Sequence, residues 1–66
     1  MKVKAKSEFS TIRIRKGLSI TALANAMQVS PSLVFRIEQG KNLTPATAKK
    51  ACDALGEDFD DLFTID

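Results

Sequence analysis

The sequence predicts an all-α fold with a helix-turn-helix at its centre, over about residues 19–39. Three observations carry this prediction. Apolar residues recur at the spacing of one helix face, good N-cap residues precede these stretches, and single glycines follow several of them. With 66 residues, the chain is long enough for one small hydrophobic core, and therefore for one domain.

Residues 1–6 are expected to form a basic N-terminal arm ahead of a helical domain at 7–66. In the arm, lysines alternate with apolar residues, at Lys2, Lys4 and Lys6. A period of two is typical of an extended arm or of a short edge strand, and the sequence leaves both open.

The first helix is predicted to begin at its N-cap, Ser7, and to reach about Lys16. Phe9 and Ile12 face inward in this helix, and Gly17 ends it.

Two short helices separated by a tight turn come next. Ser19 is a good N-cap for the first of them, whose apolar residues share one face: Ile20, Leu23, Ala24 and Met27. Ser30 caps the second, and Pro31 takes its first position, where the missing N–H costs nothing. Because only about three residues separate the two helices, they must cross steeply. Such a pair can project its second helix into a DNA major groove.

Two further helices complete the predicted domain. Thr44 and Pro45 begin a fourth helix that runs to about Leu55, and a last short helix follows Asp58 as its cap. The single cysteine, Cys52, lies at helical spacing with apolar residues of the fourth helix, so we expect it to pack as a plain core residue.

Six short motifs stand in order along the chain, at residues 12–19, 23–24, 29–30, 36–41, 51–56 and 61–63. This ordered set resembles the Cro/cI, or Xre, type of phage-repressor helix-turn-helix proteins over residues 9–63. The resemblance implies a compact five-helix, lambda-repressor-like domain that binds double-stranded DNA, usually as a homodimer on a palindromic operator. In that family the residue opening the turn is often glycine with a positive φ. Gln28 stands there in this chain, at a cost of about 1 kcal/mol.

The formal net charge of +2 is unevenly distributed. Residues 1–50 hold all ten Lys and Arg and only two acidic residues, for a charge of +8, whereas residues 51–66 hold six acidic residues and no basic one, for −6. One end of the domain therefore suits a polyanion, and the other would be repelled by it. The acidic end also fits a simpler role in helix capping and solubility.

An enzymatic function is not expected. The chain has no His and one Cys, which leaves no ligands for a zinc site and no Cys–His nucleophile, so no cofactor, metal or small-molecule ligand is predicted. No run approaches the roughly 20 apolar residues that cross a bilayer, and no signal-peptide core is present. We therefore expect a cytoplasmic, nucleoid-associated protein of a bacterial or phage-infected cell, without a membrane partner.

The outward face of the second motif helix carries the candidate base contacts, which are Ser32, Leu33, Phe35 and Arg36. A guanidinium can bond O6 and N7 of guanine together, although Arg36 also fits a phosphate contact or a solvated charge. Leu33 and Phe35 are unexpectedly apolar for this face. They could contact thymine methyl groups or sugars, Phe35 could turn into the core or a dimer interface, or the surface could bind a protein.

Phosphate contacts are expected from helix N-termini, hydroxyl groups and nearby cations, namely Thr21, Ser30, Lys41, Asn42 and Thr44. The lysines of the arm are candidates to follow the minor groove. The alternatives for the arm are a frayed terminus or a strand that pairs across a dimer.

The resemblance further implies a structural ion pair between Arg13 and Glu38. A homodimer is expected because one recognition helix covers only half a site. Its candidate contacts are Phe59, Leu62, Phe63 and Ile65.

These observations predict a sequence-specific DNA-binding transcriptional regulator, in particular a repressor of phage or mobile-element type that occupies an operator. The alternative is a protein-interaction module, an antirepressor or an accessory subunit, that uses the same fold and binds a protein through the apolar Leu33 and Phe35 face.

Overall fold

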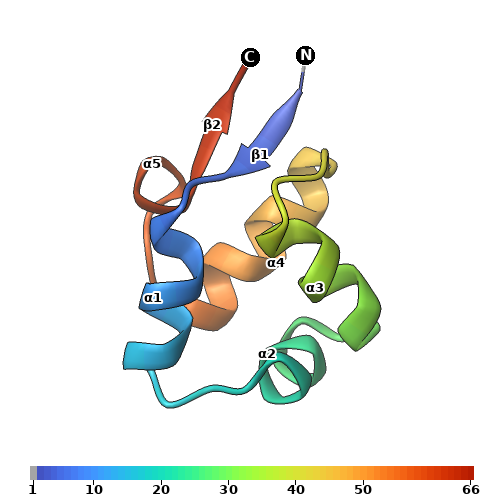
Figure 1. Cartoon of the computed structure of the whole chain (residues 1–66), viewed down its shortest axis with the longest axis vertical. Coiled ribbons are helices and arrows are strands. Elements are labelled where there is room, and N and C mark those ends of the chain that lie inside the picture. Colours follow the sequence, from blue (N-terminus) through green and yellow to red (C-terminus); the bar gives the residue numbers. More distant parts are fainter. Residues whose placement is uncertain (1) are drawn as a thin grey trace.

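The computed structural model describes residues 2–66 and contains five helices and two short strands (Figure 1). The predicted five-helix class is confirmed, and the helix-turn-helix falls on α2 and α3. A small antiparallel sheet is added to the predicted helices. In chain order the elements are β1 (Val3–Ala5), α1 (Glu8–Arg15), α2 (Ile20–Met27), α3 (Pro31–Glu38), α4 (Pro45–Leu55), α5 (Phe59–Leu62) and β2 (Phe63–Ile65).

Side-chain caps fix the starts of α2, α3 and α4. The hydroxyl oxygen of Ser19 accepts the backbone N–H of Ala22 at 3.0 Å. The Ser30 hydroxyl does the same for Leu33 at 3.3 Å, and α4 begins in the same way at Thr44. Because each cap satisfies an N–H that the helix cannot, these three starts follow from local sequence.

The predicted caps of α1 and α5 do not form. Ser7 precedes α1, but its hydroxyl donates to Oε1 of Glu8 at 3.1 Å and caps no N–H. The backbone N–H of Glu8, together with this hydroxyl, lowers the pKa of the Glu8 carboxyl. Asp58 precedes α5, and its side chain also accepts no capping hydrogen bond.

The turn between α2 and α3 uses a left-handed residue. Gln28 has φ 59° and ψ 43°, and it is the non-glycine residue with positive φ in the described chain. The next N–H, of Val29, bonds back to the carbonyl of Ala24 at 2.9 Å, which closes α2. Ala24 is fully buried, so a small residue lies where α3 comes close to α2.

The strands β1 and β2 bring the two ends of the chain together (Figure 1). They are antiparallel, and beyond them Lys2 and Asp66 exchange two backbone hydrogen bonds of 3.3 and 2.8 Å. Residues 3–5 therefore form the short edge strand that their alternation also allowed, in place of an arm outside the domain; Met1 lies outside the described residues. The register pairs Val3 with Ile65, Lys4 with Thr64 and Ala5 with Phe63.

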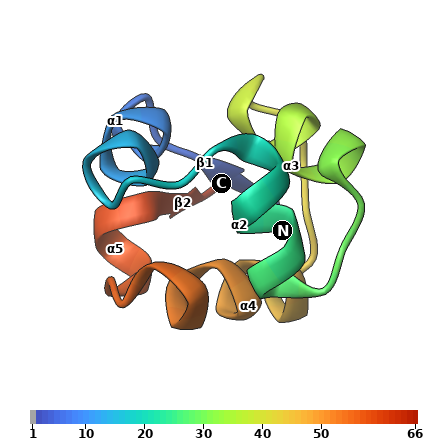
Figure 2. The ribbon, with the colours of Figure 1, turned by 90° about the horizontal axis from the view of Figure 1, so that it is seen from below.

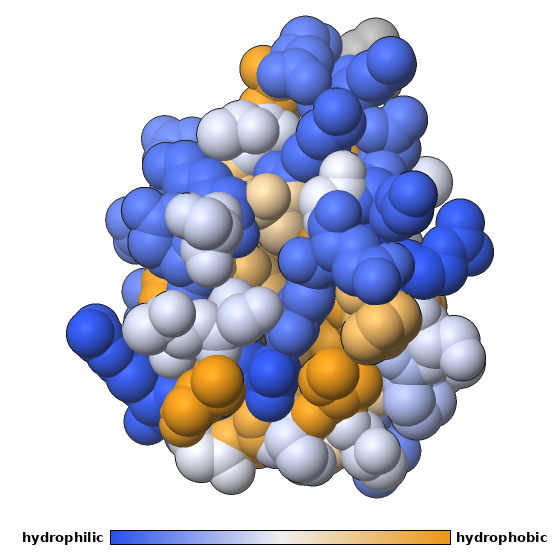
Figure 3. Space-filling model, in the orientation of Figure 1, coloured by the Kyte–Doolittle hydropathy of each residue, from blue (hydrophilic) through white to orange (hydrophobic). Residues whose placement is uncertain are grey.

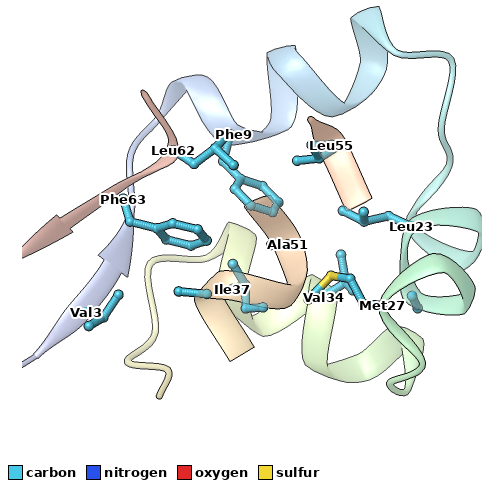
Figure 4. Close-up of a cluster of buried hydrophobic side chains, with 12 residues drawn as sticks. Val3, Phe9, Leu23, Met27, Val34, Ile37, Ala51, Leu55, Leu62 and Phe63 are labelled. Carbon is cyan, nitrogen blue, oxygen red and sulfur yellow. The ribbon is translucent and has the colours of Figure 1, made fainter. Parts of the chain in front are cut away.

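One hydrophobic core joins the sheet to all the helices (Figure 4). Phe9 and Phe63 are buried with ring centroids 5.6 Å apart, and Phe59 packs on Phe63 at 5.3 Å. Leu62 is also buried, so three of the four predicted dimer contacts are used by the core. Ile65 alone among them is exposed, at 58%.

Cys52 is half-buried and packs against this core. Burial raises the pKa of its thiol, and the adjacent Asp53 carboxylate raises it further. Between residues 2 and 66, every helix is too short or too polar to traverse a bilayer.

Candidate nucleic-acid interface

The rotation of α3 is set by Val34 and Ile37, which are both buried. Because successive helix residues are rotated by about 100°, the opposite side of α3 must face solvent. Its residues are all exposed, and we call them the recognition ridge: Ser32, Phe35, Arg36 and Gln39.

Two of the predicted base contacts differ in their placement. Phe35 is 51% exposed, so of the alternatives left open by the sequence, the one in which it turns into the core is excluded. Leu33 is half-buried and packs against the core, so it lies at the flank of the ridge. Gln39 was missed by sequence reasoning. Its spacing of four residues from Phe35 and three from Arg36 is the signal that would have found it.

The starts of three helices, α2, α3 and α4, carry the hydroxyl groups that were predicted to contact phosphates. Thr21 is exposed in the first turn of α2, beside the capped N-terminus at Ser19. Ser30 and Thr44 are exposed, and each uses its hydroxyl oxygen as an acceptor for a cap. The Thr44 hydroxyl also lies 2.9 Å from that of Thr47. The Ser30 hydroxyl proton is still available to bind an anion, and the N-terminus of a helix favours anion binding.

The loop after α3 holds Lys41 close to the end of that helix. The backbone N–H of Lys41 donates to the carbonyl of Arg36 at 3.2 Å, and the N–H of Leu43 donates to the carbonyl of Val3 at 3.0 Å. Lys41 and Asn42 are exposed between these two bonds. A cation and an amide are therefore fixed beside the ridge.

The cations divide into two groups by their partners. Lys4, Lys16 and Lys49 each form an ion pair with a carboxylate of the acidic end, at 3.8, 3.0 and 3.6 Å. In contrast, Arg36 and Lys41 have no carboxylate partner within residues 2–66. Two of the cations without a carboxylate partner in this range therefore lie beside the ridge; the others are Lys2, Lys6, Arg15 and Lys50.

Two of the three lysines of the expected arm, Lys4 and Lys6, make side-chain contacts with residues of the acidic end. Lys4 pairs with Asp66, and Nζ of Lys6 donates to the carbonyl of Asp60. Lys2 is exposed beside them. The pairing of β1 with β2 explains this change, because it sets these side chains beside the acidic C-terminal residues.

An ion pair ties α3 to α1. Nε of Arg13 donates to Oε2 of Glu38 at 2.5 Å, and Nη2 donates to Oε1 at 3.2 Å. Nη1 donates to the carbonyl of Leu18 at 2.7 Å, and the Ser10 hydroxyl donates to Glu38 at 2.8 Å. Both charged side chains are only 11% exposed. The one acidic side chain of α3 is therefore turned inward and neutralised.

The outer side of α3 is not covered by the other helices. Seen from below, α1 and α3 lie on one side of α2, and α4 lies on the other (Figure 2). In the view of Figure 1 the uncovered side faces the reader, and Figure 3 shows hydrophobic side chains among hydrophilic ones over its lower half, where α2, α3 and the end of α1 lie. Two large apolar residues of α1 and α3 are exposed, Ile14 at 63% and Phe35 at 51%.

Comparison with protein families gives a match to a helix-turn-helix family over residues 10–62. The chain belongs to the Xre-type helix-turn-helix family. The crystal structure of the clp gene regulator ClgR from C. glutamicum is similar, with 30% sequence identity and a TM-score of 0.74. The similarity covers 83% of this chain and 73% of that one. A comparison with curated proteins finds no match. Membership of this helix-turn-helix family, with its fold, supports a DNA-binding transcription regulator.

Proposed function

We propose that this chain is a sequence-specific transcriptional repressor that binds a palindromic operator as a homodimer. In this proposal α3 enters the major groove, and its ridge contacts base edges. Arg36 reads a guanine, and Ser32 and Phe35 contact neighbouring bases, with Leu33 at the flank. Thr21, Ser30, Lys41, Asn42 and Thr44 bind phosphates.

The single observation that carries the proposal is the separation of charge around α3. Arg36 and Lys41 have no carboxylate partner in the described chain, and the carboxylate of Glu38 is engaged by Arg13. The acidic residues of α5, Asp60 and Asp61, lie on a helix that packs against α1, α4 and β2. A duplex approaching α3 would therefore meet cations and hydrogen-bond donors without opposing charge.

A homodimer is proposed because one recognition helix covers too few base pairs for specificity. The free edge of β2 is the candidate contact. Lys2 and Asp66 exchange backbone bonds, and the N–H of Lys6 donates to the carbonyl of Leu62. By the alternation of an antiparallel ladder, the N–H and C=O groups of Ile65 then point away from β1. They have no partner within residues 2–66 and suit a second copy of the same strand.

Selection from a random duplex pool tests the proposal. We expect enrichment of an inverted repeat whose half-sites are about one helical turn apart. The affinity for any duplex should fall steeply as the salt concentration rises, because the basic side chains of the protein displace counterions from the DNA phosphates. The exposed Phe35 also suits a protein-interaction module, such as an antirepressor or an accessory subunit. Absence of DNA binding even at low salt would leave that second function in place of the first.

A further inference from the structure

Phe35 is an exposed aromatic side chain in the middle of the recognition ridge. About half of its surface stays open to solvent, at 51%. It belongs to neither of the aromatic pairs of the described chain, which involve Phe9, Phe59 and Phe63. The burial of both Val34 and Ile37 accounts for this exposure, because at about 100° per residue Phe35 lies on the side of α3 away from these two. The side chain is therefore held outward by the fold.

The surroundings of Phe35 restrict what can cover it. Arg36 follows it directly and Lys41 is anchored just beyond the helix, both without a carboxylate partner among residues 2–66. Glu38 is turned toward Arg13 and adds no free negative charge. An apolar side chain surrounded by cations fits a partner with a groove that has anionic groups along its edges and apolar groups at its bottom. The major groove of DNA has both, since phosphates line it and the thymine C5-methyl group projects into it.

We infer that Phe35 determines sequence specificity by packing on the C5-methyl group of a thymine beside the base that Arg36 reads. This inference rests on the proposed function and adds the base class that one residue recognises. Consecutive helix residues differ by about 100° in direction and about 1.5 Å in height, so the two side chains spread over neighbouring base pairs. Each half-site should therefore contain a thymine next to a guanine.

Replacement of single thymines by deoxyuridine in the selected operator tests this inference. Uracil keeps every hydrogen-bonding group of thymine and lacks only the methyl group. For the unmodified protein, each lost methyl group should weaken binding about fourfold, the effect of one apolar carbon buried from water. One replacement in each half-site removes two methyl groups from the complex and should therefore weaken binding about fifteenfold. The Phe35→Ala variant should bind the thymine operator more weakly and should lose its sensitivity to that replacement. Phe35→Leu should keep the sensitivity, because an apolar contact remains.

Ile14→Ala provides the matched control, since Ile14 is equally apolar and even more exposed but lies on α1. It should leave the uracil pattern unchanged. Equal affinity for all uracil-substituted operators, or full uracil sensitivity in Phe35→Ala, would overturn the inference while DNA binding itself stands. Loss of uracil sensitivity in Ile14→Ala would move the methyl contact to α1 and overturn it as well. A protein that binds no duplex at low salt would remove the proposed function and the inference together.

Discussion

The Arg13 guanidinium and the Glu38 carboxylate connect α1 to the last turn of α3, with Nε 2.5 Å from Oε2 and Nη2 3.2 Å from Oε1. The same guanidinium holds the carbonyl of Leu18 in the loop before α2. Helix α1, the loop before α2 and the end of α3 therefore meet at one nearly buried charge pair. Their relative positions decide how α3 projects from the domain, so this pair positions the ridge without touching DNA itself.

Glu38→Gln should destabilise the fold. The substitution leaves the Arg13 guanidinium nearly buried without its counter-charge, and we expect a loss of about 1.5–3 kcal/mol in the free energy of unfolding. Urea denaturation followed by circular dichroism measures this loss. Asp53→Asn is the control, because the Lys49–Asp53 pair is exposed and should contribute less than about 1 kcal/mol. Unchanged stability of Glu38→Gln with altered DNA affinity would contradict a structural role.

Gln28→Gly should stabilise the protein. Gln28 has φ 59°, where a side chain is strained and glycine is not. After allowance for the greater freedom of glycine in the unfolded chain, we expect a net gain of about 0.5–1 kcal/mol and a Tm several degrees higher. Calorimetry measures the shift, with Gln28→Ala as a variant that keeps the strain. An equal gain from alanine would show that backbone strain is not the cause.

Arg36→Ala and Lys41→Ala should weaken DNA binding in different ways. Loss of a guanine contact by Arg36 should cost about 1–3 kcal/mol and relax the preference at one position of each half-site. Loss of a phosphate contact by Lys41 should weaken all duplexes alike and lower the salt dependence by about one ion per protomer. Affinities over a range of salt, on the operator and on a scrambled duplex, separate the two. If Arg36→Ala lowered the affinity for the operator and for the scrambled duplex equally, Arg36 would be a phosphate contact.

Ile65→Lys should shift the protein toward monomers without unfolding it. Ile65 is 58% exposed, so the domain does not need this side chain buried, whereas a lysine on a free strand edge opposes pairing with a second copy. Sedimentation velocity over a range of concentrations measures the change. Ile14→Lys, at an equally exposed site on α1, should leave the distribution as it is. Identical association by the two variants would move the dimer contact away from β2.

Cys52 should react slowly with alkylating reagents in the folded state. Burial, with a contribution from Asp53, raises the pKa of its thiol, and only the thiolate reacts. At pH 7 to 8 the folded protein should therefore react more slowly than the denatured chain. As the pH rises, the rate for the folded protein should continue to increase after that of the denatured chain levels off. The opposite order of the two pH profiles would contradict this account.

The helices were predictable because their signals are local. Ser19, Ser30 and Thr44 each cap a helix within three residues of their own position. The left-handed turn at Gln28 was expected from the resemblance and is present. The predicted cap at Ser7 was wrong for an equally local reason. The Ser7 hydroxyl donates a hydrogen bond to the adjacent Glu8 carboxylate and accepts none from the helix N–H groups.

Contacts between residues far apart in the sequence were harder to predict. The alternating lysines near the N-terminus fitted an arm and a strand equally well. Residues 63–65, with which this segment pairs, lie at the other end of the sequence, so no local pattern could decide between the two. The same pairing draws Phe63 into the core and leaves Ile65 outside it. On α3 the buried residues were predictable from their spacing. Which of Leu33 and Phe35 is the more exposed depends on how α3 is rotated against the core, and the sequence does not give this rotation.

The hydrogen bonds between Lys2 and Asp66 also bear on how the protein is made. Residues 3–5 leave the ribosome long before residues 63–65, so β1 cannot pair with β2 until the latter have been synthesised. The helices from α1 to α4 can associate earlier through contacts between near neighbours. Until Phe63 arrives, Phe9 lacks its aromatic partner, and the nascent chain offers this apolar surface to chaperones and proteases.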